Sequence, residues 1–180
     1  MTIIAAADGS ALGNPGPAGW AWYADPTHWA SGGWPHGTNN MGELMAVLDL
    51  LRSTAHLDEP LLVYCDSRYV IDSITKWMAG WKRKGWKKKD GKPVLNIELM
   101  KALDASMAGR KVRFEWVKGH SGHPLNEEAD RLANAAACAH RDKVDVASGP
   151  GFPGARTSPA PAAAPVAPVE DDPDLFSMLD

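Results

Sequence analysis

Two short apolar runs, each followed by an aspartate and a turn-forming residue, constrain the fold of this chain most strongly. Residues 3–7 read Ile-Ile-Ala-Ala-Ala before Asp8, and residues 61–65 read Leu-Leu-Val-Tyr-Cys before Asp66. Apolar runs of this length, bounded by turn formers, are typical of strands that are buried on both faces. Such strands need helices on both sides of the sheet, so the two runs favour an α/β domain.

Periodicity in the rest of the chain predicts the other elements. Apolar residues at i, i+3, i+4 and i+7 predict a helix that starts near Asn40. The Asp25-Pro26 pair between two aromatic-rich runs predicts a hairpin. Strands are expected at 2–8, 19–24, 28–35, 61–65 and 111–117, and helices from near Asn40, over 70–78, from about Pro93 to Met107 and over 124–140. This order predicts an α/β domain with a five-stranded mixed sheet and helices on both faces.

The composition changes near the C-terminus. From about residue 147 the chain is rich in Ala, Pro, Gly and Ser, and residues 142–180 hold two basic and seven acidic residues. Such a segment buries too little apolar surface to offset its chain entropy, so it is expected to be disordered. We therefore expect a folded, mildly basic domain over 1–142 and a disordered, acidic, Ala/Pro-rich tail over 143–180.

Cysteine content and hydropathy bear on the compartment. The chain has two cysteines, which imply no disulfide framework and suit a reducing cytoplasm. The first residues lack the basic region of a signal peptide, and no apolar run approaches the ~18 residues of a membrane span. A cytoplasmic monomer without membrane contact is expected.

Four acidic residues stand at the edges of predicted elements. Singly, Asp8 could open a turn, Glu43 could complete a capping box with Asn40, Asp66 could cap a helix and Asp130 could be a solvated helix residue. Jointly, Asp8 and Asp66 would end neighbouring parallel strands, in the crevice where α/β sheets bind ligands. Carboxylates gathered there repel unless a cation is bound, and the set suits Mg²⁺.

Several motifs carry a resemblance to a known family. They are Asp8-Gly9-Ser10 and the stretches 13–19 (GNPGPAG), 38–44 (TNNMGEL), 65–70 (CDSRYV), 81–87 (WKRKGWK), 116–124 (WVKGHSGHP) and 126–130 (NEEAD). In this order, over residues 1 to about 140, the chain resembles the bacterial type 1 ribonucleases H. One motif alone would be weak, whereas several in register are highly specific, and the resemblance implies a ribonuclease H-like fold.

The resemblance implies an endonuclease that cuts the RNA strand of RNA–DNA hybrids and leaves 5′-phosphate and 3′-hydroxyl ends. Asp8, Glu43, Asp66 and Asp130 fall on the family's catalytic carboxylates, which hold two Mg²⁺ ions, with Mn²⁺ as a usual substitute. Asp8 and Asp66 are expected to bridge the ions, whereas Glu43 and Asp130 each bind one. His120 falls on the family's loop histidine, a proton shuttle or an aid to product release; as a residue alone it could be an ordinary polar loop residue.

The resemblance also implies hybrid contacts. Asn14, Asn39, Asn40 and Arg68 fall on positions that line the minor groove, where amides can bond base edges and 2′-hydroxyls. Arg68 departs from the glutamine that is frequent there and favours phosphate contact, and Ala11 stands where a cysteine is frequent. Thr38 is a candidate for a DNA-strand phosphate and Asn96 for a groove-proximal position. Turn and cap chemistry would explain these amides equally well.

A basic segment adds a further candidate surface. Between Lys76 and Lys92 there are eight basic residues and one acid, interleaved with three tryptophans. The segment could be only a solvated face, but in the family it is a handle that grips the DNA strand. Trp77 is expected in the core. The expected contacts are Trp81, Lys82, Lys84, Trp86, Lys87 and Lys88.

Two other functional classes remain open from the sequence. One is another nuclease or strand-transfer enzyme on the same fold, and the other is a non-catalytic nucleic-acid-binding module. The end of the tail mixes acids with Leu175, Phe176, Met178 and Leu179. It is either a solubilising extension or a docking motif for a replication or repair protein.

Overall fold

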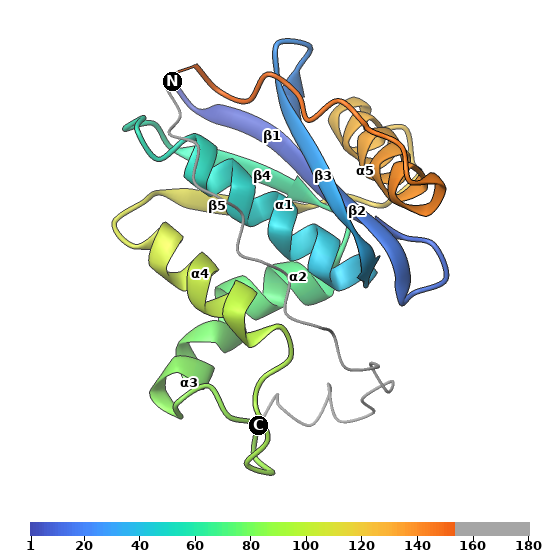
Figure 1. The fold of residues 1–180 in the computed structure, drawn as a ribbon. Coiled ribbons are helices and arrows are strands. Elements are labelled where there is room, and N and C mark those ends of the chain that lie inside the picture. Colours follow the sequence, from blue (N-terminus) through green and yellow to red (C-terminus); the bar gives the residue numbers. More distant parts are fainter. Residues whose placement is uncertain (154–180) are drawn as a thin grey trace.

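The computed structural model describes residues 1–153, and its strands form one sheet in the order β3-β2-β1-β4-β5 (Figure 1). The strands are β1 (Ile3–Ala11), β2 (Gly16–Asp25), β3 (His28–Gly37), β4 (Leu61–Cys65) and β5 (Val112–Trp116). The helices are α1 (Asn39–Ser53), α2 (Arg68–Asp72), the π-helical turn η1 (Ser73–Trp77), α3 (Met78–Arg83), α4 (Ile97–Met107) and α5 (Pro124–Asp142). The docking motif expected near the end of the tail lies outside the described residues.

The sheet is mixed, as predicted. β2 pairs antiparallel with β1 and β3, whereas β4 pairs parallel with β1 and β5. The expectation that the first strand stops at Asp8 is wrong, because β1 continues to Ala11 and Asp8 is paired with Ala21. The parallel ladder with β4 does end earlier, at the pair Ala6 and Tyr64. Asp8 therefore lies just beyond the point at which β4 leaves β1.

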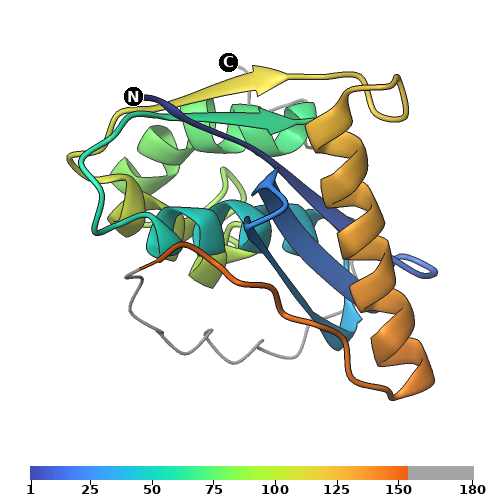
Figure 2. The same cartoon turned by 90° about the horizontal axis from the view of Figure 1, so that it is seen from above.

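Helices cover both faces of the sheet (Figure 2). α1 packs on one face, against β1 and β2, and α4 covers the other side of α1. This double burial explains why α1 is buried almost all round, from Met41 through Leu48. α5 crosses β1, β2 and β3 on the opposite face and packs through small residues such as Ala129 and Ala133. The predicted fold class is confirmed.

Helix starts differ from the sequence-based expectations. The cap of α1 is Thr38, whose hydroxyl accepts from Met41 N at 3.1 Å, and not Asn40. The cap of α2 is Ser67, so Asp66 does not cap the helix. α4 begins at Ile97, four residues after Pro93. Pro93 instead forms a β-bridge with Lys87, which closes the loop before α4.

The segment after α5 follows the edge strand β3. Lys143 adopts a left-handed conformation (φ 55°) and ends the helix. The amide of Ser31 then donates to Ser148 O, and the amide of Gly151 donates to Trp29 O, each at 3.0 Å. We call residues 143–153 the C-terminal strap; its ordered contacts differ from the disorder that composition predicted from residue 147.

A single aromatic side chain fastens the end of the strap. The ring of Phe152 stacks on Trp22, with centroids 5.4 Å apart, and lies 4.7 Å from the ring of His28. The indole N–H of Trp22 donates to Asp49 Oδ2 at 2.7 Å on α1. The strap therefore joins the β2–β3 hairpin to the helical layer.

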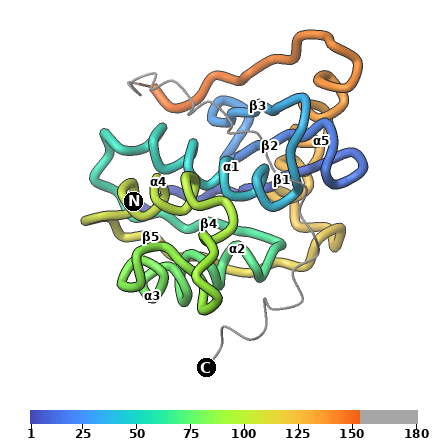
Figure 3. The backbone as a smooth tube through the Cα atoms, turned by 60° about the horizontal axis from the view of Figure 1, so that its bottom comes forward, coloured from blue at the N-terminus to red at the C-terminus, as the bar shows by residue number. Residues whose placement is uncertain are grey.

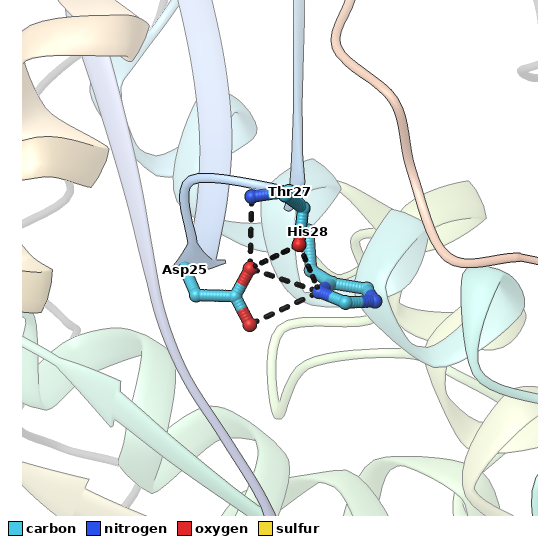
Figure 4. A network of polar contacts seen from close by, with 3 residues as sticks. All are labelled: Asp25, Thr27 and His28. Carbon is cyan, nitrogen blue, oxygen red and sulfur yellow. Dashed lines mark hydrogen bonds and ion pairs between the residues drawn. The ribbon is translucent and has the colours of Figure 1, made fainter.

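The hairpin turn that receives the strap is held by one carboxylate (Figure 4). Asp25 Oδ1 accepts from the amide and the hydroxyl of Thr27, both at 2.8 Å, and Nδ1 of His28 lies 2.9 and 3.0 Å from the two carboxylate oxygens. Desolvation opposes ionisation of Asp25, but the bonds from His28 and Thr27 outweigh it and lower its pKa. His28 is thereby fixed where Phe152 packs against it.

No helix within residues 1–153 is long and apolar enough to cross a membrane.

Candidate active site

Three of the four singled-out acids meet at one point of the fold. Asp8 comes from β1, Glu43 from the first turns of α1, and Asp66 from the residue after β4. Each offers one carboxylate oxygen, and these oxygens all lie within 4.8 Å of one another. We call these three residues the acidic cluster. Its geometry agrees with the expectation that the crevice beyond β1 and β4 gathers carboxylates.

Glycines allow α1 to approach β1 closely enough for Glu43 to join the cluster. A Cβ atom built on Gly42 would lie 2.9 Å from the Cα of Gly9 and would also contact Gly19 O. One built on Gly9 would meet the backbone of Asn39 and Glu43. Contacts this short are not tolerated by real Cβ atoms, so helix and strand touch backbone to backbone here. This close approach places the carboxylate of Glu43 on α1 next to that of Asp8 on β1.

The cluster is an unusual electrostatic environment. Asp8 is 2% exposed and Glu43 5%, and within residues 1–153 neither Asp8 Oδ2 nor Glu43 Oε2 has a hydrogen-bond partner. Burial, with the charges of Asp66 and Asp130 adding to it, raises the pKa of Asp8 to about 7. Burial and the charge of Asp8 raise the pKa of Glu43 well above its usual range.

These observations test whether the site suits a cation. Buried carboxylate oxygens without donors are costly, and a proton shared between Asp8 and Glu43 relieves the repulsion only partly. A divalent cation relieves it fully, because carboxylate oxygens are the preferred ligands of Mg²⁺ and Mn²⁺. The residues present therefore fit a bound metal ion.

Asp130 and His120 lie at the rim of the cluster. Nδ1 of His120 is 4.0 Å from Asp130 Oδ2, and their side chains are 83% and 40% exposed. Within the described residues Asp130 is not part of the three-acid group, although its charge contributes to the raised pKa of Asp8. His120 has a left-handed backbone (φ 55°), and Gly122 follows with φ 89°. The loop thus presents the imidazole to solvent beside Asp130.

The asparagines next to the cluster hold one another in place. Asn39 Oδ1 accepts from Ala11 N at 2.7 Å, and Asn14 Oδ1 accepts from Asn39 N at 3.1 Å. Their oxygens therefore perform the turn chemistry that was one of the two expectations, while their amide NH₂ groups form no hydrogen bond within the described part of the chain. Asn40 is half-buried. Thr38 is 7% exposed and its hydroxyl caps α1, so its side chain is less accessible than a phosphate contact requires.

Asn96 lies apart from the loops that carry the other asparagines. It is half-buried and adopts a left-handed conformation (φ 55°) directly before the first residue of α4. Its position at the start of this helix is a local structural role.

The basic segment projects from the body of the protein as α3 and the loop to α4 (Figure 1, Figure 3). The expectation of an exposed Trp81 is wrong, because this side chain is only 7% exposed and belongs to the core. Trp77 packs against the same core, as expected; it is half-buried, and its buried indole N–H has no partner within residues 1–153. Trp81 is therefore not placed to contact a nucleic acid. We call residues 76–92 the basic protrusion.

The polar side chains of the basic protrusion surround a shallow pocket. The pocket has a volume of about 230 Å³ and is lined by Lys76, Trp77, Ala79, Gly80, Trp81, Arg83, Lys84, Lys88 and Lys89. Lys82 points elsewhere and forms an ion pair of 2.9 Å with Asp104. Trp86 is half-buried at the base of the loop, where its amide donates to Trp81 O. Lys87 is exposed. Of the expected contacts, the lysines are the ones that reach solvent.

Sequence reasoning missed the role of Trp116. This residue is the register partner of Cys65 on the neighbouring strand, and its indole N–H donates to Asp66 O at 3.0 Å. The sequence placed it in the predicted strand 111–117 and in the motif 116–124, and its side chain was assigned no role. No pattern in the sequence signals a side-chain bond to the backbone of a distant residue.

Comparisons with known proteins identify the family. A model of the RNase H family matches residues 2–138. The chain is 53% identical over 150 residues to a ribonuclease H of Tropheryma whipplei (strain Twist), which covers 83% of this chain and 93% of that protein. It is 50% identical over 132 residues to a ribonuclease H of Agrobacterium fabrum, which covers 70% and 88%.

Solved structures agree in fold. LC9-RNase H1, described as a type 1 RNase H with the type 2 active-site motif, superposes with a TM-score of 0.65 at 31% identity, over 84% of this chain and 77% of that chain. The N-terminal RNase H domain of rv2228c from Mycobacterium tuberculosis gives a TM-score of 0.59 at 27% identity, over 79% and 97%.

Proposed function

The chain belongs to the ribonuclease H family, and from this premise we propose which of its residues carry the activity. It is an endonuclease that hydrolyses the RNA strand of RNA–DNA hybrids. The observation that carries the assignment of the site is the acidic cluster, in which buried carboxylate oxygens without donors converge. We assign the catalytic domain to residues 1–142.

The acidic cluster and Asp130 form the metal site in this proposal. Two Mg²⁺ ions bound there would activate a water for in-line attack on the phosphate and stabilise the leaving 3′-oxygen. Asp8 and Asp66 would hold the ions together with Glu43, which would reach them from the buried side, and Asp130, which would reach them from the exposed rim. Mn²⁺ would substitute for Mg²⁺ because it has a similar preference for carboxylate oxygens.

His120 acts on the solvent side of the same site. Its exposed imidazole, 4.0 Å from Asp130, can accept a proton from water near the metal site and release it to solvent. The glycines on both sides of it in the sequence, Gly119 and Gly122, leave the loop free to adjust as product leaves.

The hybrid is held by two surfaces on either side of the cluster. The amide NH₂ groups of Asn14, Asn39 and Asn40 suit the minor groove, where they donate to base edges and 2′-hydroxyls without sequence preference. The lysines of the basic protrusion bind phosphates of the DNA strand. Lys84, Lys87 and Lys88 are the main contacts, while Lys82 must first exchange its bond to Asp104.

A digestion panel tests this proposal. The full chain is incubated with an RNA–DNA hybrid, duplex DNA, duplex RNA and single strands, with Mg²⁺ and with EDTA. Cleavage of only the RNA strand of the hybrid, only with metal, is expected, with 5′-phosphate and 3′-hydroxyl ends. Asp66→Asn should abolish cleavage and leave binding of the hybrid measurable. Full activity in Asp66→Asn would contradict the metal mechanism, and binding without cleavage in the wild-type chain would favour a non-catalytic binding module.

We further propose an oligomeric state, a location and a partner for this protein. The protein acts as a monomer in the cytoplasm, and its C-terminal residues bind a replication or repair protein. Size-exclusion chromatography coupled to light scattering tests the first, and cell fractionation the second. The third is tested by whether replication and repair proteins captured by the full chain are lost when residues 154–180 are removed.

A further inference from the structure

Trp116 contacts the backbone of one metal-ligand candidate and the side chain of an arginine close to it in sequence. Its indole N–H donates to the carbonyl of Asp66, and the guanidinium carbon of Arg68 lies 4.3 Å from the centroid of its ring. Arg68 is the first residue of α2, two positions after Asp66. One side chain at the end of β5 thus fixes the backbone of an acid in the cluster and the side chain of a cation beside it.

The stacked arginine is oriented but not neutralised. Arg68 is exposed, and Trp116 is 42% exposed, so the pair lies on the surface next to the acidic cluster. Within residues 1–153, Arg68 forms no ion pair with a carboxylate. Stacking on the indole face contributes about 0.5–1 kcal/mol at an exposed site and restricts the guanidinium plane. The N–H edge of the guanidinium remains available to an anion.

The chemistry of the guanidinium selects the anion. An arginine is charged at all relevant pH values and presents parallel N–H donors that match phosphate oxygens. Near a metal site that acts on a phosphodiester, the nearest such group belongs to the nucleic-acid backbone. A glutamine at this position would offer one uncharged NH₂ group, so the arginine adds a positive charge and a forked pair of donors to the contact.

Building on the proposed function, we propose that Arg68 binds a backbone phosphate of the hybrid close to the scissile phosphate, and that Trp116 is the positioning residue for this contact. Trp116 holds the guanidinium by stacking and holds Asp66 through its carbonyl. Phosphate binding and metal-ligand geometry are therefore linked through a single indole.

The test uses three variants of the full chain: Arg68→Gln, Trp116→Leu and Trp116→Phe. Binding of a hybrid is measured in EDTA across a salt series, and KM and kcat are measured with Mg²⁺. Loss of one phosphate contact should reduce the magnitude of the log–log salt slope by about 1. Arg68→Gln should therefore flatten the slope by about 1 and raise Kd and KM roughly tenfold at low salt, since a bond to a charged group is lost. Its kcat should change little.

The two tryptophan variants separate positioning from a structural role. Trp116→Leu removes the stacking surface and should flatten the salt slope as Arg68→Gln does. The double variant Arg68→Gln/Trp116→Leu should flatten the slope no further than either single variant. Trp116→Phe keeps a ring under the guanidinium and should retain the wild-type slope. Because it loses the N–H that holds Asp66 O, it should lower kcat.

Distinct results would overturn the inference. An unchanged salt slope in Arg68→Gln, with or without a higher KM, would show that the residue contacts no phosphate. A Trp116→Phe variant as impaired in slope as Trp116→Leu would show that stacking does not position Arg68. If the wild-type chain cleaves the hybrid, either of these results from the variants contradicts this inference alone. A wild-type chain that does not cleave contradicts the proposed function instead.

Discussion

Asp8 and Glu43 face each other inside the protein, and each has one carboxylate oxygen without a hydrogen-bond donor among residues 1–153. The strand supplies one acid and the helix the other, and backbone contact between Gly9 and Gly42 sets their separation. The arrangement is unfavourable in the metal-free protein when both groups are ionised. The stability of the metal-free protein should therefore fall as these groups ionise, and a bound metal ion should restore it.

The metal-free protein should lose stability as the pH rises. The pKa of Asp8 is raised from 3.8 to about 7, so the folded state binds more protons than the unfolded state within this interval. The contribution of Asp8 protonation to the free energy of unfolding is therefore complete below about pH 4. It is lost as the pH rises through about 7, and its upper limit is on the order of 4 kcal/mol. Thermal unfolding in EDTA should show a Tm that falls between pH 5 and pH 8.

Two controls accompany that measurement. Asp8→Asn removes the titrating group and should make the fall in Tm much smaller. Mg²⁺ binds the ionised form, so it should raise the Tm more at pH 8 than at pH 5. A Tm that rises steadily with pH in EDTA would contradict the placement of Asp8 in a buried acidic cluster.

Gly42→Ala should abolish most activity and destabilise the protein by a few kcal/mol. The added methyl group would meet the backbone of Gly19 and Gly9, so α1 must move away from β1 and carry Glu43 with it. Gly80→Ala is the matched control, because it is also a helical glycine but has only the end of Arg83 nearby, at 3.9 Å. That control should be neutral or slightly stabilising, since alanine favours helix. Assays of kcat and urea unfolding compare the two, and equal effects would contradict the close approach.

The basic protrusion should account for most of the salt dependence of hybrid binding. If about four lysines neutralise phosphates, the slope of the logarithm of affinity against the logarithm of salt concentration should be roughly −3 to −4. Glutamine at positions 82, 84, 87 and 88 should flatten this slope and raise KM, with little loss of kcat at saturation. Glutamine at Lys101 and Lys111, which are exposed elsewhere, is the control. A quadruple variant with the wild-type slope would exclude the basic protrusion as the phosphate-binding surface.

The sequence predicted the sheet and the meeting of the acids because both depend on local patterns. Apolar runs marked β1 and β4, and their shared edge brought Asp8 and Asp66 together without any further information. The burial of Trp81 was not predictable in this way. The π-helical turn Ser73–Trp77 widens the helix, so the apolar stripe continues through Met78 to Trp81, and Trp77 lies at its side.

Tertiary contacts explain the other differences. Pro93 is compatible with a first helical turn, but the bridge to Lys87 uses it to close the loop, and α4 begins later. Composition correctly describes the strap as poor in apolar residues. Composition cannot show that the ring of Phe152 packs against two other rings, those of Trp22 and His28. Nor can it show that the edge of β3 offers backbone hydrogen-bond partners to an extended segment.

The strap should stabilise the domain without taking part in catalysis. A chain that ends at residue 143 loses the stacking on Trp22 and the backbone bonds to Trp29 and Ser31, so it should unfold at a Tm several degrees lower than a chain that ends at residue 153. Phe152→Ala in the full chain should give part of this loss, about 1–2 kcal/mol for a half-buried ring. The kcat at saturation should be unchanged in both.

Removal of the strap also exposes the edge of β3, so the shorter chain should self-associate at high concentration. Thermal unfolding and size-exclusion chromatography measure both effects. Equal Tm values for the two truncated chains would show that the strap contacts contribute nothing to stability.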